Sequence, residues 1–253
     1  MRQPTFGDRI ASGTVVARAG GPPHCPAADH TVTQPAADPP PLHCLLCAST
    51  RVSEHAEAAG RRFWRCADCA LVFVDPGQWL APQQEADYYR LHRNDPDDPG
   101  YRRFVAPLVE ALCAQLPPAS QGLDFGCGPG SAPAAMLGEA GHRVRGYDPQ
   151  FLPDATALEA RYDFIVLCEV IEHLHAPAAV FAQLRALLQG PALIAIKTGF
   201  LPEPERFARW HYLRDPTHVA LYSPASLQWL ANHLGLHCAL RPEQGVALLS
   251  APR

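Results

Sequence analysis

Apolar residues between positions 105 and 249 recur in a pattern that alternates between strands and helices. Runs of continuous apolar character stand at 162–168 and 192–196, which is typical of strands buried on both faces. Between them, residues 178–189 place apolar side chains three and four positions apart, as an amphipathic helix does. Strands that alternate with helices predict a doubly wound, mostly parallel α/β sheet of the Rossmann-like kind.

Similar patterns predict the remaining elements of this domain. Helices are expected at 105–116, where Pro107 delays or kinks the regular part, at 131–140, and from Ser223 to Gly235. Further strands are expected at 122–126, at 142–148, around Ala239 and at 246–249. Only residues 149–161 separate the strand at 142–148 from the strand at 162–168. This stretch is too short for a helix and another strand, so we expect the sheet to lack its third strand.

The first 42 residues do not share this pattern. They are rich in Ala, Gly, Pro and Thr and contain few large apolar residues, so they cannot bury enough surface to offset the entropy cost of ordering. We therefore predict a disordered extension at 1–42, a cysteine module at 43–75, a polar connector at 76–100 and the main domain at 101–253.

Length and charge limit the classes of function. A chain of 253 residues has room for one α/β domain and one small module. The net charge of -4 argues against a general nucleic-acid binder, which needs a basic face. No apolar run reaches the roughly 18 residues of a membrane span, and Asp8 and Arg9 interrupt the place of a secretory signal. These features predict a soluble, cytoplasmic protein.

Four cysteines form two Cys-x-x-Cys pairs, Cys44/Cys47 and Cys66/Cys69. Four thiolates at this spacing predict a closed tetrahedral zinc site, which folds a ribbon without taking part in catalysis. The other five cysteines stand singly, which disfavours a disulfide framework, and a redox dithiol needs only one pair. Residues 71–73, just after the second pair, predict a strand of this zinc ribbon.

A glycine-rich loop, Gly126-Cys127-Gly128-Pro129-Gly130, joins a predicted strand to a predicted helix. Its glycines permit a tight turn and a close approach of the backbone to a ligand. Asp124 stands two residues before the loop, and Asp148 closes the next strand, where a carboxylate can accept both ribose hydroxyls. Alternatively, the loop is a turn that binds nothing, or it belongs to a dinucleotide-binding fold.

In these residues the chain resembles class I S-adenosylmethionine-dependent methyltransferases, whose first motif has the form Asp-x-Gly-x-Gly-x-Gly. The resemblance covers about residues 101–249. The cofactor-binding residues that it implies are Asp124, Gly126, Cys127, Gly128, Gly130, Asp148 and Glu169. Among them, Asp148 holds the ribose, and Asp124 orients the ammonium group directly or through water. Without a third strand the usual acidic contact to adenine has no fixed counterpart in this sequence, and Asp154 is the one nearby candidate.

The segment from Cys168 to Leu174, Cys-Glu-Val-Ile-Glu-His-Leu, follows a strand at its carboxyl end, where open α/β sheets bind ligands. It resembles Glu-x-x-Glu-His segments of methyltransferases related to the quinone-biosynthesis O-methyltransferases. In some relatives, including small-RNA 2'-O-methyltransferases, such a segment and a later His hold a divalent metal. This implies ligands for Mg²⁺, Mn²⁺ or Zn²⁺ among Glu169, Glu172, His173 and His218. We favour the alternative, in which Glu169 faces the cofactor and the others form hydrogen bonds.

Methyl transfer from a sulfonium is an in-line displacement, so the protein mainly positions the acceptor and removes its proton. His173 and His218 are the candidate general bases. The loop at 200–222 carries Trp210, Tyr212 and other aromatic residues. Such a loop suits an acceptor pocket or lid, and it is equally consistent with a simple cover for the end of the sheet.

The sequence thus predicts a methyltransferase acting on an oxygen, nitrogen or carbon atom of a small molecule. Two alternatives remain. In the first, the acceptor is RNA, and the ribbon clamps it with three arginines, Arg61, Arg62 and Arg65. In the second, the chain is a non-catalytic zinc- and nucleotide-binding module. The intact glycine loop and Asp148 disfavour this second alternative, because a silent domain does not need them.

Overall fold

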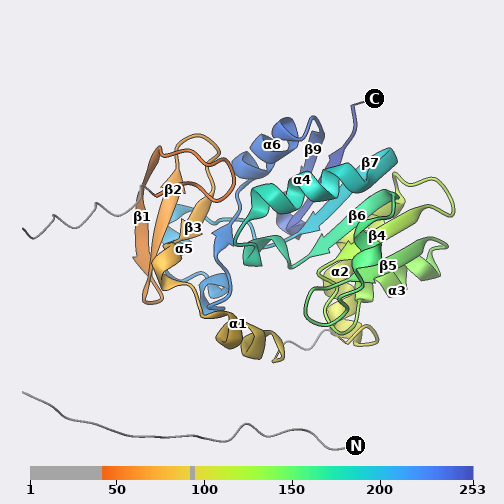
Figure 1. Ribbon diagram of the computed structural model, residues 1–253, viewed down its shortest axis with the longest axis horizontal. Coiled ribbons are helices and arrows are strands. Elements are labelled where there is room, and N and C mark those ends of the chain that lie inside the picture. Colours follow the sequence, from red (N-terminus) through yellow and green to blue (C-terminus); the bar gives the residue numbers. More distant parts are fainter. Residues whose placement is uncertain (1–41, 92–94, 253) are drawn as a thin grey trace, which may run out of the picture. The chain divides into compact units, whose positions relative to one another are not determined.

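The computed structural model describes residues 42–91 and 95–252 (Figure 1). The extension predicted to be disordered at 1–42 therefore lies outside the described residues, except for Leu42. The described residues belong to one compact unit. Within them, none of the helices is long and apolar enough to cross a membrane.

Six strands form the main sheet, in the order β5-β4-β6-β7-β10-β9 (Figure 1). They are β4 (Gln121–Phe125), β5 (Arg143–Tyr147), β6 (Tyr162–Cys168), β7 (Leu188–Lys197), β9 (His237–Arg241) and β10 (Val246–Ser250). The first four are parallel, and β10 is antiparallel to both of its neighbours. This sheet confirms the predicted α/β fold. Between β5 and β6 the only element is the 3-10 turn η2 (Ala155–Leu158), so the third strand is missing, as predicted.

Helices pack on both faces of the main sheet. They are α2 (Pro99–Cys113), α3 (Ala132–Glu139), α4 (Pro177–Leu187) and α6 (Pro224–His233). Phe164 and Val166 of β6 share a buried cluster with α2 and α3. Ile165 and Leu167 share another with α4 and α6. Because neighbouring residues of a strand point to opposite faces, this double burial explains why β6 is apolar throughout.

The region before the main sheet is more helical than the sequence indicates. Helix α2 begins at Pro99, because Asp98 accepts a hydrogen bond of 2.6 Å from the Tyr101 N–H and Pro99 occupies the first turn. It runs through Pro107, so the expectation that the regular part of the helix starts only late, at this proline, is wrong. The 76–100 connector also contains the 3-10 turn η1 (Pro76–Gln78) and a helix, α1 (Pro82–Tyr89), that the pattern does not predict.

A second, smaller sheet has the order β1-β2-β3-β8 and is antiparallel. Three strands come from the cysteine module: β1 (Val52–Ala58), β2 (Arg61–Cys66) and β3 (Val72–Val74). The fourth, β8 (Ala220–Leu221), comes from the loop at 200–222, which also holds α5 (Pro204–Phe207) and the 3-10 turn η4 (His211–Arg214). The cysteine module therefore shares a sheet with a loop of the main domain.

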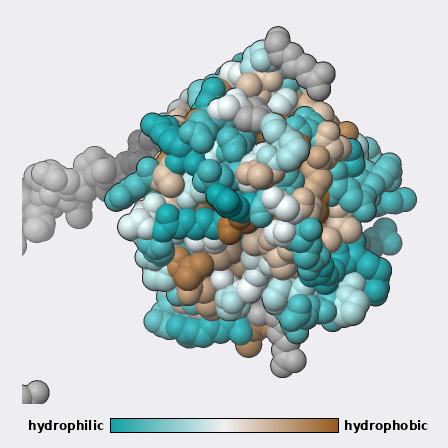
Figure 2. All heavy atoms as spheres, turned by 90° about the vertical axis from the view of Figure 1, so that its right-hand side faces the viewer, coloured by the Kyte–Doolittle hydropathy of each residue, from teal (hydrophilic) through white to brown (hydrophobic). Residues whose placement is uncertain are grey.

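The surface on the side of α3 and β5 is mostly hydrophilic. Figure 2 shows that its hydrophobic areas are small and separated by hydrophilic side chains. Among the described residues, the large hydrophobic side chains that are exposed are Leu91, Phe104 and Leu152. The described residues on this side therefore present no broad apolar area of the kind that marks a permanent interface.

Candidate functional site

A cavity of about 370 Å³ opens at the carboxyl ends of β4, β5 and β6. The segments after these three strands supply much of its wall, and α1 supplies another part. The lining residues are Glu85, Tyr89, Phe125, Gly126, Gly128, Pro129, Asp148, Pro149, Gln150, Phe151, Glu169, Val170, His173, Leu174 and Val180. The cavity lies where the chain crosses from β5, on one side of β4, to β6 on the other, which is the usual place for a ligand in an open α/β sheet.

The glycine loop after β4 has the tight backbone that the sequence indicates. Gly126 and Gly128 have φ angles of 77° and 62°, which only glycine adopts at little cost. A Cβ atom on Gly126 would lie 2.7 Å from Cγ2 of Val170. The Gly126 N–H donates to the carbonyl oxygen of Tyr147 over 2.7 Å. The loop is thus held against the end of β5 and turns its backbone toward the cavity.

Asp148 connects the ends of β4 and β5. Its Oδ2 atom accepts a hydrogen bond of 3.0 Å from the Gly128 N–H. Its Oδ1 atom accepts from the N–H groups of Gln150 and Phe151, over 2.8 and 2.9 Å. The carboxylate is therefore held by three backbone donors while it lines the cavity, so its position is set before any ligand arrives.

Three other predicted cofactor residues, Asp124, Cys127 and Gly130, do not line the cavity. Asp124 is buried under the loop, where Ser131 donates to its carboxylate, and burial raises its pKa to about 6. The Cys127 sulfur lies next to Gly146 of β5. Each can act on a ligand only through the loop backbone or a water molecule.

Asp154, the candidate for an adenine contact, lies outside the cavity. It caps η2 by accepting from the Thr156 N–H over 3.1 Å, and it forms an ion pair with Arg145. Pro149, Gln150 and Phe151 line the cavity beyond Asp148 instead.

Glu169 follows β6 directly and has a backbone φ of 54°. A side chain other than glycine or asparagine in this conformation is strained, and such strain is often found at functional sites. Its N–H donates to the carbonyl oxygen of Lys197 over 2.8 Å, which fixes the turn. The carboxylate lines the cavity, its Oε2 atom lies 3.1 Å from the Tyr212 hydroxyl, and burial raises its pKa.

Glu172, His173 and His218 lie together, and each has one possible ligand atom within 4.8 Å of the others. The donor set for a metal therefore exists, although Glu169 does not belong to it. In the structure, Glu172 already accepts hydrogen bonds: from the Tyr212 hydroxyl at Oε1, and from the Thr198 hydroxyl at Oε2 over 3.0 Å. Burial raises the pKa of Glu172 well above its ordinary value.

The two candidate bases, His173 and His218, differ in position. His173 lines the cavity. Its Nδ1 atom lies 3.3 Å from the carbonyl oxygen of Thr217 and 3.0 Å from the Thr217 hydroxyl. Because a carbonyl oxygen only accepts, Nδ1 carries the hydrogen, and in the neutral ring Nε2 has the lone pair. The Thr217 hydroxyl donates in turn to Asp215 Oδ1.

His218 lies behind His173 and does not line the cavity. The two ring centres are 4.7 Å apart, and His218 is 7% exposed. Its Nδ1 atom donates to the carbonyl oxygen of Tyr212 over 2.8 Å. Of the two predicted bases, His173 is therefore the one that a substrate in the cavity can contact.

Helix α1 forms a wall of the cavity that the sequence pattern does not predict. Glu85 and Tyr89 both face the cavity, and the Tyr89 hydroxyl donates to Glu85 Oε1 over 2.7 Å. The ring centre of Tyr89 lies 5.2 Å from that of His173, and Gln150 donates to the carbonyl oxygen of Ala86 over 3.0 Å. The four-residue spacing of Glu85 and Tyr89 places them on one helix face, a signal available in the sequence.

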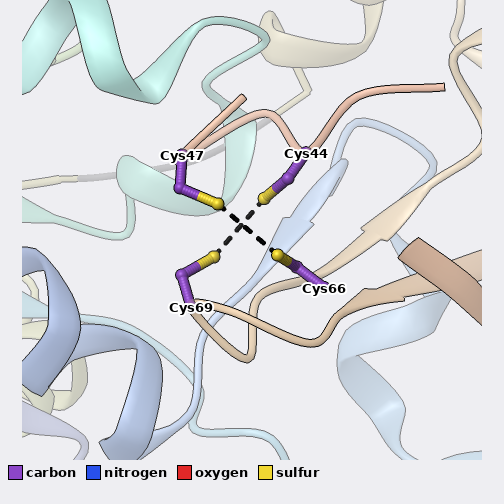
Figure 3. A group of neighbouring side chains, drawn as sticks. All are labelled: Cys44, Cys47, Cys66 and Cys69. Carbon is purple, nitrogen blue, oxygen red and sulfur yellow. Dashed lines mark hydrogen bonds between the residues drawn. The ribbon is translucent and has the colours of Figure 1, made fainter. Parts of the chain in front are cut away.

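The four cysteines of the two pairs point toward a common centre (Figure 3). The Cys44 and Cys69 sulfurs lie 3.4 Å apart, as do those of Cys47 and Cys66, and all four sulfurs lie within 4.8 Å of one another. Four sulfurs around a tetrahedral zinc ion at 2.3 Å would be about 3.8 Å apart. The arrangement therefore suits a tetrahedral zinc ion, with these two pairs somewhat closer than in a filled site.

The backbone supports the same interpretation, because the two pairs form equivalent turns. The Ala48 N–H donates to the Cys44 carbonyl oxygen over 2.9 Å, and the Ala70 N–H donates to that of Cys66 over 3.1 Å. Both alanines have positive φ angles, 57° and 60°. Each Cys-x-x-Cys pair thus closes around its sulfurs in the same way, as two knuckles of one ribbon do.

The three arginines of β2 have different environments. Arg61 is half-buried and donates four hydrogen bonds to backbone carbonyl groups between Leu213 and His218. Arg62 is exposed and forms an ion pair of 3.3 Å with Glu57, and Arg65 is exposed.

Comparison with known families identifies the domain. Residues 98–239, more than half of the chain, match the family model described as a methyltransferase domain. The chain belongs to this methyltransferase family. The enzyme class expected from the sequence, an S-adenosylmethionine-dependent methyltransferase, is thereby confirmed. The matched range of this methyltransferase contains the glycine loop, Asp148 and the segment from Glu169 to His173.

Solved structures of other methyltransferases resemble the chain at low sequence identity. One is 1,6-didemethyltoxoflavin-N1-methyltransferase of Burkholderia thailandensis, with 18% identity, a TM-score of 0.49, and coverage of 79% of this chain and 100% of that chain. Another is magnesium protoporphyrin IX methyltransferase of Synechocystis PCC 6803, with 19% identity, a TM-score of 0.44, and coverage of 60% and 84%. No curated protein sequence matches this methyltransferase.

Proposed function

We propose that this methyltransferase binds S-adenosylmethionine in the cavity and methylates a small molecule. The observation that carries the proposal is the position of the glycine loop and Asp148 on one wall of a cavity at the carboxyl ends of β4, β5 and β6. When bound, the cofactor supplies an electrophilic methyl group on a sulfonium. The protein's own task is to orient the two reactants and to accept a proton.

On the cofactor side, the loop at Gly126 and Gly128 suits the methionine part, because its backbone lets a ligand approach closely. The Asp148 carboxylate suits the ribose, since three backbone donors leave one lone pair on Oδ2 that can accept from a ribose hydroxyl. Phe151 and Pro149, beyond Asp148, provide an apolar surface for adenine. Asp124 acts from beneath the loop and contributes negative charge toward the cationic cofactor.

On the acceptor side, the lining residues with polar groups are Glu85, Tyr89, Glu169 and His173. Neither Arg nor Lys occurs among the described residues that line the cavity, so a phosphate group would meet carboxylates without a cationic partner. Arg61 donates its hydrogen bonds to backbone carbonyl groups of this chain, and Arg62 is paired with Glu57. Both interactions disfavour the hypothesis that these arginines clamp RNA. We therefore favour a small acceptor without phosphate groups.

His173 is our choice for the general base. Thr217 and Asp215 hold the ring with the hydrogen on Nδ1, so that Nε2 has the lone pair that can take the acceptor's proton. This is the orienting arrangement that general bases require. It suits an acceptor oxygen or nitrogen that loses a proton as the methyl group is transferred. The four cysteines would hold a structural zinc ion, with no part in this chemistry.

A labelled-methyl assay on the full chain tests this function. Protein and tritiated S-adenosylmethionine are incubated separately with the small-molecule and RNA fractions of a cell extract. We expect label in the small-molecule fraction, reduced about 100-fold by His173→Gln. His237→Gln, which changes an exposed histidine of β9, serves as the matched control and should retain the wild-type rate. Label confined to RNA would refute the small-molecule acceptor. Equal rates in the two variants would refute the role of His173 as general base.

A further inference from the structure

Arg61 is a residue of the cysteine module whose side chain reaches into the main domain. Its Nη1 atom donates to the carbonyl oxygens of Pro216 and His218, over 3.3 and 2.9 Å. Its Nη2 atom donates to those of Leu213 and Asp215, over 2.8 and 3.1 Å. The rigid fork of a guanidinium can serve several carbonyl groups at once, which a lysine ammonium cannot do in the same geometry.

The segment that Arg61 holds is the one that contacts the candidate base. Between Leu213 and His218 lie Asp215 and Thr217, which orient the Nδ1 atom of His173. The segment is also fixed at its end, because the Val219 N–H donates to the carbonyl oxygen of Glu172 over 2.8 Å. The position of the base therefore depends on backbone that the ribbon holds.

The cysteine module contacts this loop at further points. Strand β3 pairs with β8, and the Val74 N–H donates to the carbonyl oxygen of Val219 over 2.9 Å. Phe63, two residues after Arg61, contacts Phe207 of the same loop with ring centres 5.1 Å apart. The strand that carries Arg61 and Phe63 ends at Cys66, so the cysteine site fixes one end of the strand.

We propose that Arg61 is a positioning residue for methyl transfer: it holds Asp215 and Thr217 in the place from which they orient His173, so that the cysteine module acts on the active site through this loop. The inference rests on the proposed function in one respect, the role of His173 as base. The contacts of Arg61 with the loop do not depend on it.

Two measurements on the full chain test the proposal without a known acceptor. Hydrogen exchange monitored by mass spectrometry reports the loop at 211–222, and nitrogen-15 NMR of the histidine rings reports which nitrogen of His173 carries the hydrogen. In Arg61→Ala we expect at least about tenfold faster exchange in this loop and a mixture of His173 tautomers in place of the Nδ1–H form. Exchange in the glycine loop at 124–130 should not change.

Arg65→Gln is the matched control, since Arg65 is an exposed arginine of the same strand; it should match the wild type in both measurements. Arg61→Lys keeps the charge but not the fork, so it should show an intermediate change, and it carries the test if Arg61→Ala does not fold. Wild-type exchange and tautomer in the Arg61 variants, or equal changes in Arg65→Gln, would overturn the proposal. Calorimetry with S-adenosylhomocysteine on the same samples separates the two ideas, because absence of binding to the wild type would refute the proposed function alone.

Discussion

The Nδ1 atom of His173 lies 3.0 Å from the hydroxyl of Thr217, and 44 positions of the chain separate the two residues. The contact joins the segment after β6 to the loop that the ribbon holds. In Thr217→Val the hydroxyl is lost while the carbonyl oxygen still accepts from His173. We expect methyl transfer to slow about tenfold, which corresponds to about 1.4 kcal/mol.

Single-turnover rates with the acceptor that the labelled-methyl assay identifies would measure this change. Thr217→Ser retains the hydroxyl and is the matched control. Calorimetry should give the same cofactor affinity for both variants, because Thr217 does not line the cavity. Equal rates for Thr217→Val and wild type would show that the hydroxyl does not orient the base.

Asp148→Ala should weaken binding of S-adenosylhomocysteine at least about tenfold, or about 1.4 kcal/mol. The substitution removes the acceptor for the ribose and the support of the Gly128 N–H. Isothermal calorimetry measures the affinity, and Asp154→Ala, outside the cavity, is the control that should bind as the wild type does. Binding of NAD, with no heat from S-adenosylmethionine or S-adenosylhomocysteine, would instead indicate a dinucleotide enzyme.

The protein should carry about one zinc ion per chain, and the double variant Cys44→Ser/Cys69→Ser should lose it. Because the cysteine module shares a hydrophobic cluster with α4 and α6, we expect the loss to lower the melting temperature of the whole unit in a single transition. Elemental analysis and scanning calorimetry measure the two effects. Cys113→Ser changes a cysteine that does not belong to the four-cysteine group and should retain the ion. Zinc-free wild-type protein would rule out the site.

We expect no catalytic role for a metal at Glu172, His173 and His218. The Tyr212 hydroxyl already donates to one carboxylate oxygen of Glu172, and the Thr198 hydroxyl donates to the other. Chelation that removes loosely held ions should not reduce methyl transfer, provided that elemental analysis shows no loss of the zinc expected at the four cysteines. The experiment uses the full chain, because β3 of the cysteine module pairs with β8 and removing the module would leave β8 without its partner strand. If Mg²⁺ restored lost activity in the wild type but not in Glu172→Gln, a metal mechanism would replace ours.

Asp124 should lower the stability of the ligand-free protein at neutral pH. Burial raises its folded pKa from 3.8 to about 6, so the folded state binds the proton more tightly than the unfolded chain. Stability therefore falls as pH rises from about 4 to 6 and is constant above, and the total cost is roughly 3 kcal/mol. Asp124→Asn should melt at a higher temperature than wild type at pH 7.5 and at the same temperature near pH 3.5.

In the same variant, calorimetry should show weaker binding of S-adenosylmethionine, because the buried negative charge beneath the glycine loop, which attracts the cationic cofactor, is gone. Ser131→Ala is a useful comparison, since it removes the hydroxyl that donates to Asp124 while keeping the charge. A lower melting temperature for Asp124→Asn at neutral pH would show that the ionised carboxylate stabilises the fold.

Local sequence signals determined much of this protein. The apolar run of β6, the glycine spacing after β4 and the aspartate that closes β5 indicated the sheet and the place of its ligand, because burial on two faces and a tight turn each require particular residues within a few positions. The two Cys-x-x-Cys pairs indicated a ribbon for the same reason. The short stretch at 149–161 excluded a third strand by length alone.

Only the tertiary structure decided how the active site is assembled. In the sequence Arg61 is a candidate for RNA binding, but its side chain donates to the carbonyl oxygen of His218, 157 positions away. The pairing of β3 with β8, the wall formed by α1 and the link from His173 to Thr217 are of the same kind. Hydrogen bonds between distant segments depend on which backbone groups the packed core brings within about 3 Å, and no local pattern of residues encodes that distance.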